Sequence, residues 1–238
     1  MLCLRSVLFS IVPLFAFASL ASADPIEINQ LTFSNPPSWL KKSQLQKVVD
    51  HAEKYLEWDI RKVEVFWHPD QAEFQKAHGF DASVLAFTRG TDHSVHIGPR
   101  VNATNFEAIF GHELTHVIVF QKYKSAIPKW LEEGLANYVG KAAKVDYPWL
   151  ATQPPQQIST LGHPFKAVYT PGSPSVSAKY HYMASTAAIE MIASKCDLEQ
   201  LLQLSVGKSL TSYFDTFCGI PDLDDEFKKW IKRKGGVH

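Results

Sequence analysis

The sequence predicts an α+β fold, with a small sheet near the N-terminus and a mainly helical C-terminal part. The first observation behind this prediction is a period-two alternation of apolar residues, typical of strands, which is confined to the first half of the chain. The second is the spacing of apolar residues by three and four, typical of amphipathic helices, which dominates the second half. No internal repeat or low-complexity tract interrupts the sequence, so we expect one domain over 24–238, sheet-bearing at about 24–104 and helical at about 105–238.

In the sheet-bearing part, apolar residues recurring at three and four predict a helix over 43–58, with Ser43 as its N-cap. A second, shorter helix is expected over 71–78 and should end at Gly79. Alternating patterns bounded by turn residues indicate strands between and after these helices. The predicted strands are 63–67, 84–88 and 94–97.

In the helical part, the same periodicity continues almost to the C-terminus. The predicted helices are 106–123, 128–139, 180–194, 198–206, 210–217 and 223–232. The stretch 147–179 is rich in proline, and we expect it to be poorly structured. With His163 it can form a lid over a cleft, or serve as a disordered tether.

Residues 1–23 differ in composition from the rest and are predicted to be a cleavable signal peptide. Arg5 precedes an apolar run from Val7 to Leu20, and the small residues Ala21-Ser22-Ala23 follow it. As a helix, the 14 residues of this run would span only about 21 Å, short of the roughly 30 Å hydrocarbon core of a bilayer. We therefore expect export to the periplasm or the medium, without stable membrane insertion after cleavage.

Composition argues for an ordinary globular protein without a polyanionic partner. Of its residues 45% are hydrophobic and 20% are charged, and 24 basic side chains balance 24 acidic ones. Such a balance predicts no nucleic-acid binding. Removal of the signal peptide leaves Cys196 and Cys218, which we expect to pair as a disulfide in an exported chain; two buried free thiols are the alternative.

The strongest motif is His112-Glu113-Leu114-Thr115-His116, which fits the H-E-x-x-H pattern within the predicted helix 106–123. Residues four apart lie on one face of a helix, so both imidazoles can bind one zinc ion at about 2.0 Å. Glu113 lies one position on, where it can accept a proton from the attacking water. The alternative is a surface helix with two incidental histidines, but the apolar residues around the motif favour a buried helix.

A third ligand is expected from the segment Pro128 to Tyr138, which contains Trp130-Leu131-Glu132-Glu133-Gly134. With the H-E-x-x-H motif, this segment resembles the gluzincin metallopeptidases, the group that includes thermolysin and aminopeptidase N. In that family a glutamate within W-L-x-E-G on the next helix completes the zinc site, which implies Glu133 here. Only 16 residues separate His116 from Glu133, so the connection is slightly shorter than in those two relatives. From the residues alone, Glu132 remains a rival ligand.

Further residues are expected to support the ligands and the reaction, Asn137 from its spacing along the helix and Tyr182 from the resemblance. Asn137, one turn after Glu133, would orient the far nitrogen of His112, although it can equally be an ordinary surface residue. Tyr182 would stabilise the negative oxygen of the reaction intermediate. Its neighbours Tyr180 and His181 can do the same work, and each tyrosine can instead simply anchor the start of a helix.

The family likeness spans about residues 94–232, but only the two motifs are specific. It implies a thermolysin-like minimal fold in which strand 95–97 is an exposed edge that a substrate peptide extends; an ordinary sheet edge is the alternative. The G-x-M-E-N segment of related aminopeptidases is missing, which favours endopeptidase activity. We therefore expect an exported zinc metallopeptidase acting on peptides or proteins. The alternatives are a non-catalytic zinc-binding adaptor or assembly factor, and a purely structural domain.

Overall fold

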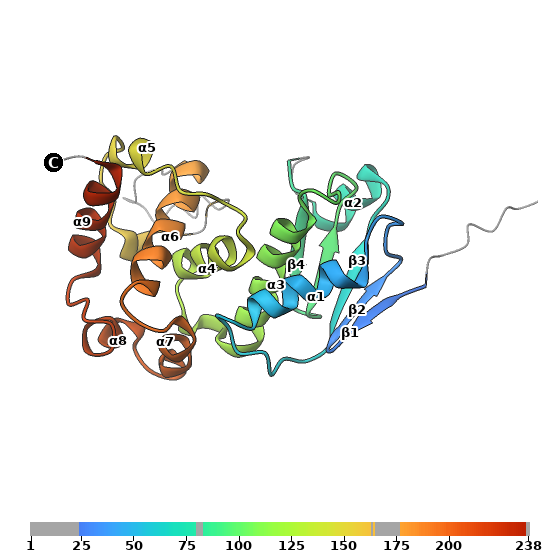
Figure 1. The fold of residues 1–238 in the computed structure, drawn as a ribbon, viewed down its shortest axis with the longest axis horizontal. Helices are drawn as coiled ribbons and strands as arrows, with labels where there is room; N and C mark the ends of the chain where they lie inside the picture. The colour runs from blue at the N-terminus through green and yellow to red at the C-terminus, as the bar shows by residue number, and fades with distance from the viewer. Residues whose placement is uncertain (1–23, 80–82, 163, 165–176, 237–238) are drawn as a thin grey trace, which may run out of the picture.

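The computed structural model describes residues 24–79, 83–162, 164 and 177–236, so the predicted signal peptide lies outside the described residues. The strands are β1 (Ile26–Ile28), β2 (Leu31–Ser34), β3 (Val63–Trp67), β4 (Ala86–Arg89) and β5 (Ser94–Ile97). The helices are α1 (Lys42–Ala52), α2 (Gln71–His78), α3 (Phe106–Lys122), η1 (Lys124–Ala126), α4 (Lys129–Gly140), α5 (Tyr147–Ala151), η2 (Ile158–Thr160), α6 (Ala178–Ala193), α7 (Leu198–Ser205), α8 (Leu210–Thr216) and α9 (Leu223–Gly235). The α+β prediction is confirmed. Figure 1 shows the sheet at one end of the molecule and helices α5 to α9 at the other, with α3 and α4 between them.

Within the described residues, five strands form one mixed sheet in the order β1-β2-β3-β5-β4. Strands β2, β3 and β5 run parallel, whereas β1 and β4 pair antiparallel with their neighbours at the two edges. The sequence analysis did not predict β1 and β2, which have three and four residues and precede the first predicted helix.

The expectation that strand 95–97 forms an exposed edge is wrong. Strand β5 is paired on both sides, with β3 and with β4. The chain enters β5 through a tight turn after Arg89, so β4 lies outside it and forms the edge nearest α3. Strand β4 is also displaced from the predicted 84–88 toward the turn.

One face of the sheet packs against α1 and α3 to form the main core. Val63, Val65, Val95 and Ile97 are fully buried, and the period of two places them all on this face. The helices cover them with apolar residues at helical spacing. These are Leu45, Val48 and Val49 of α1, and Phe106, Phe110, Leu114, Val117 and Ile118 of α3.

Helix α1 is shorter than the predicted 43–58, and Ser43 is not its N-cap. Lys41 precedes the first turn, and its backbone N–H donates to the side chain of Gln44. At the other end the chain leaves the helix after Ala52, where the backbone N–H of Leu56 still donates to the carbonyl oxygen of Ala52. Leu56 is nevertheless buried, so a turn satisfies the apolar pattern that suggested a longer helix.

Helices α3 and α4 approach each other closely because glycines face glycines. A Cβ atom at Gly140 would lie 2.5 Å from the backbone nitrogen of His112, and one at Gly111 would lie 2.9 Å from the Cα of Gly140. Gly134 plays the same part between α4 and α6, since a Cβ there would lie 2.8 Å from the carbonyl carbon of Ser185. These contacts fix α4 against two neighbours on either side of the segment that carries Glu133.

The stretch 147–179, expected to be poorly structured, contains α5 and η2 in its described part. Pro148 lies in the first turn of α5, where its missing N–H costs nothing, and the carboxylate of Asp146 accepts from the backbone N–H of Trp149. This local capping outweighs the helix-breaking effect of proline within the stretch. Residues 163 and 165–176 lie outside the described residues, His163 among them.

The C-terminal helices are joined by a disulfide between Cys196, after α6, and Cys218, after α8. Asp197 and Asp222 cap the N-termini of α7 and α9, where their carboxylates accept from backbone N–H groups of the first turn. Among the described residues, no helix combines the length and apolar character needed to cross a membrane.

Candidate metal centre

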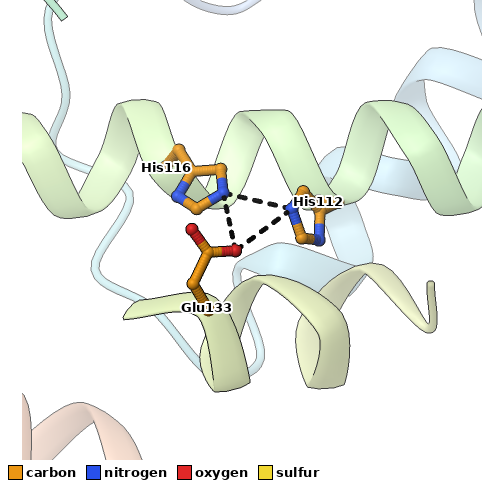
Figure 2. A group of neighbouring side chains, drawn as sticks. All are labelled: His112, His116 and Glu133. Carbon is orange, nitrogen blue, oxygen red and sulfur yellow. Dashed lines mark hydrogen bonds and ion pairs between the residues drawn. The ribbon is translucent and has the colours of Figure 1, made fainter. Parts of the chain in front are cut away.

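Helices α3 and α4 bring two imidazoles and one carboxylate together (Figure 2). His112 and His116 lie four residues apart on α3, and their Nε2 atoms are 3.1 Å from each other. The Oε2 atom of Glu133 lies 3.7 Å from each of these nitrogens. Among the described residues, these three form the one group of metal-binding side chains whose ligand atoms converge in this way.

Glu132, which the sequence left as a rival ligand, lies elsewhere. Its Oε1 atom is 2.7 Å from Nδ1 of His116, the ring nitrogen that does not face His112. This contact makes Nδ1 the proton-bearing nitrogen of the neutral His116 imidazole, and in that form Nε2 presents a lone pair to the group. The two adjacent glutamates therefore contact opposite sides of one imidazole, Glu132 at Nδ1 and Glu133 at Nε2. The turn of about 100° between neighbouring helical positions accounts for this separation.

The charges around His116 are strongly coupled. Burial alone would lower its pKa, but the hydrogen bond with Glu132 and the nearby carboxylates outweigh burial and raise the pKa. Burial would raise the pKa of Glu132, whereas its contacts with His116 and Lys129 hold that pKa at about 2. Glu132 is thus ionised whenever the protein is folded near neutral pH.

Lys129 is a site residue that the sequence analysis missed. Its ammonium group lies 2.8 Å from Oε1 of Glu132 and 3.2 Å from Oε1 of Glu133. Burial would lower the pKa of Lys129, but these two carboxylates outweigh it and raise the pKa. The ammonium thus takes one oxygen of Glu133 and leaves the other, Oε2, facing the histidines. The signal in the sequence is its spacing along α4, because Lys129 precedes Glu132 by three positions and Glu133 by four.

The second nitrogen of His112 faces Asn137. Burial, followed by the charge of His116, lowers the pKa of His112 to about 3, whereas the side chain of Asn137 acts in the opposite direction. Neither Nδ1 of His112 nor Nδ2 of Asn137 has a well-oriented hydrogen-bond partner among the described residues. Asn137 is itself buried, so it is not the exposed polar residue of the alternative interpretation.

Glu113 lies beside the group but not in it. It is buried, and its Oε2 atom accepts a hydrogen bond of 2.8 Å from the hydroxyl of Thr88 on β4. Burial raises the pKa of Glu113. Thr88 was not singled out in the sequence, because it precedes Glu113 by 25 positions and only the pairing of β4 brings it to α3.

A cavity of about 810 Å³ lies over these side chains. Residues of β4, α3, α4 and α6 line it, including Thr88, Glu113 and Tyr182. Burial, and then the charges of Glu133 and Glu113, raises the pKa of Tyr182, so its hydroxyl keeps its proton. Apolar side chains at the two ends of the motif, Ile109 and Phe120, also line the cavity.

The two alternatives to Tyr182 are engaged elsewhere. The hydroxyl of Tyr180 accepts from the backbone N–H of Gln156, at 3.2 Å. The imidazole of His181 bonds the carbonyl oxygen of Gly162 through Nε2 and lies 3.4 Å from the hydroxyl of Ser185 through Nδ1. Of these three residues, only Tyr182 lines the cavity.

Comparison with known proteins does not assign this group of side chains to a family. No protein-family model and no curated protein matches the chain. The chemistry open to the site therefore follows from its own side chains: a candidate metal centre built by His112, His116 and Glu133, with a buried carboxylate and a tyrosine beside it in a cavity.

Proposed function

We propose that the chain is an exported zinc-dependent metallopeptidase of the gluzincin type, with a thermolysin-like minimal fold, which cleaves peptide bonds as an endopeptidase. The observation that carries the proposal is the convergence of His112, His116 and Glu133 beside Glu113 at the wall of one cavity. A structural metal site would need neither the cavity nor an additional, non-ligating carboxylate.

The three ligand atoms fit zinc in kind and in spacing. A triangle with sides of 3.1, 3.7 and 3.7 Å has a point about 2.0 Å from every corner, and zinc binds imidazole nitrogen and carboxylate oxygen at about 2.0–2.2 Å. Two histidines and one glutamate leave a coordination position open, as catalytic zinc sites do. A bound zinc ion would act as a Lewis acid and would lower the pKa of a water molecule in that position.

Glu113 serves as the general base. It takes a proton from the attacking water and passes it to the leaving amine. This role requires a pKa closer to neutral pH than that of an exposed glutamate. The burial of Glu113 raises its pKa in this direction. Its position next to His112 in the chain keeps it beside the ligands while pointing it away from them.

Two further residues support the reaction. The hydroxyl of Tyr182 lines the cavity and remains protonated, so it can donate to the substrate oxygen that becomes negative. Asn137 orients His112: when Nε2 binds a metal, Nδ1 carries the proton, and the amide oxygen of Asn137 would accept it. Such a partner explains why a polar amide is buried at this point of α4.

The substrate is a peptide or an unfolded protein segment. Strand β4 is the free edge of the sheet beside the cavity, and an extended peptide can pair with such an edge. The missing G-x-M-E-N segment leaves no recognised anchor for a free amine, which favours cleavage within a chain. The N-terminal sequence and the disulfide both suit an exported protein in an oxidising compartment.

The proposal is tested by measuring zinc per chain and casein cleavage for the wild type, Glu113→Ala and Glu133→Ala. We expect Glu113→Ala to keep zinc and lose activity, and Glu133→Ala to lose much of both. Glu107→Ala is the matched control, because Glu107 is on the same helix but pairs with Lys47 outside the cavity.

Two results would contradict the proposal. Stoichiometric zinc in a wild-type protein that cleaves no tested chain would favour a zinc-binding adaptor. A wild type that takes up no stoichiometric zinc would favour a purely structural domain.

A further inference from the structure

Strand β4 carries one hydroxyl that contacts the proposed general base twice. The Oγ1 atom of Thr88 lies 2.8 Å from Oε2 of Glu113 and 2.9 Å from the carbonyl oxygen of the same residue. We propose that Thr88 is a positioning residue for Glu113, holding Oε2 so that Oε1 remains as the oxygen that accepts the proton. This inference rests on the proposed peptidase function and adds a residue to it.

The pairing of β4 with β5 directs Thr88 toward α3. Thr88 is opposite Val95, which is fully buried on the core face of the sheet. The preceding residue, Phe87, points to the other face and stacks on His96, with ring centroids 4.5 Å apart. The stack fixes the orientation of β4, and the alternation of side chains then fixes where the hydroxyl of Thr88 lies.

The hydroxyl has a single hydrogen and two acceptors within reach. The carbonyl oxygen of Glu113 belongs to α3, where helical carbonyls already accept from the backbone four residues ahead. A carboxylate is the stronger acceptor, because hydrogen bonds to charged oxygens are shorter and stronger than those to neutral ones. The hydroxyl of Thr88 therefore donates to Oε2 of Glu113, and its oxygen remains close to the carbonyl.

This arrangement suits a residue that gains and loses a proton. If the incoming proton binds Oε1, then Oε2 is an acceptor both before and after the transfer, so the bond to Thr88 persists. Without that bond, three side-chain torsions separate the carboxyl group of Glu113 from the backbone and nothing else on β4 restrains it. A base that is displaced by even about 1 Å loses much of its efficiency.

The test compares Thr88→Val, which keeps the shape and removes the hydroxyl, with Thr88→Ser, which restores it. We expect Thr88→Val to keep zinc stoichiometry, melting temperature and KM close to wild type while kcat falls roughly 10- to 100-fold. Thr88→Ser should recover most of the lost kcat. The control is Thr32→Val, the same substitution on β2 at a position that does not line the cavity. It should change neither kcat nor KM.

Crystal structures of the two variants provide a readout that does not need activity. We expect the carboxyl group of Glu113 to change rotamer in Thr88→Val and to keep it in Thr88→Ser. An unmoved carboxyl group in Thr88→Val would overturn the inference, as would a loss of kcat that serine does not restore. A wild type inactive on casein would refute the peptidase function instead, and the rotamer of Glu113 would then decide the role of Thr88 alone.

Discussion

Replacing Gly134 by alanine sets two physical effects against each other. Alanine is the better helix former, by about 1 kcal/mol in a helix interior, which would stabilise α4. Its Cβ atom, however, would collide first with the carbonyl oxygen of Ser185 and would lie 2.7 Å from Cγ1 of Ile189, both on α6. An ordinary contact begins near 3.4 Å, so α4 and α6 must separate by about 1 Å at this point.

The obstacle is backbone as well as side chain, so we expect the steric effect to exceed the propensity gain. Overpacking a core costs about 1–3 kcal/mol, and the upper end of that range less the propensity gain leaves a net loss of about 2 kcal/mol. For a domain of this size, that corresponds to a fall in melting temperature of roughly 4–8 °C. The displacement also carries Glu133 away from the histidines, so zinc affinity should fall as well.

Thermal unfolding followed by circular dichroism, on metal-free and zinc-loaded protein, measures both effects of Gly134→Ala. Gly162→Ala is the control, because a Cβ atom there would meet nothing within 4 Å. A melting temperature for Gly134→Ala equal to or above that of the wild type would refute the reasoning, since it would mean that helix propensity outweighs the contact with α6.

Three further perturbations follow from the site and the sheet. Lys129→Met removes the cation between the buried carboxylate of Glu133 and the partly exposed one of Glu132, so the metal-free protein should lose about 3 kcal/mol of stability, and zinc should raise its melting temperature more than that of the wild type; an equal zinc-induced rise in both would contradict this. Asn137→Ala should weaken zinc binding roughly 10- to 100-fold in a chelator competition and Asn137→Asp should not, whereas equal affinities would exclude a role for Asn137 in orienting His112. Burial, and then the charge of Arg89, lowers the pKa of His96 to about 4 from 6.5. The unfolded chain therefore binds the extra proton first, and the free energy of unfolding should fall as pH drops from about 6.5 to 4; urea titrations should show a smaller fall for His96→Phe, and an identical pH dependence would oppose this account.

The parts of the site that could be predicted from sequence are those set by one helix. His112, Glu113 and His116 follow from the repeat of α3, and Phe110 and Leu114 mark its buried side. The W-L-x-E-G likeness then distinguished Glu133 from Glu132, which periodicity alone did not. The structure places both glutamates accordingly, at opposite sides of His116.

The parts that escaped prediction depend on contacts between distant segments. Thr88 acts only because β4 pairs outside β5, and no local pattern tells an edge strand from an inner one. Strands β1 and β2 precede the first predicted element and were not predicted, yet they complete the sheet. The helix beginning at Tyr147 escapes prediction because proline usually interrupts a helix, although it is well tolerated in a first turn, where Pro148 lies.

Apart from Tyr182, every side chain assigned to the site comes from the continuous stretch between Thr88 and Asn137. The strands before this stretch and the helices α7 to α9 support it from outside. Substitutions in those flanking parts should therefore alter how firmly the stretch is held rather than what it binds.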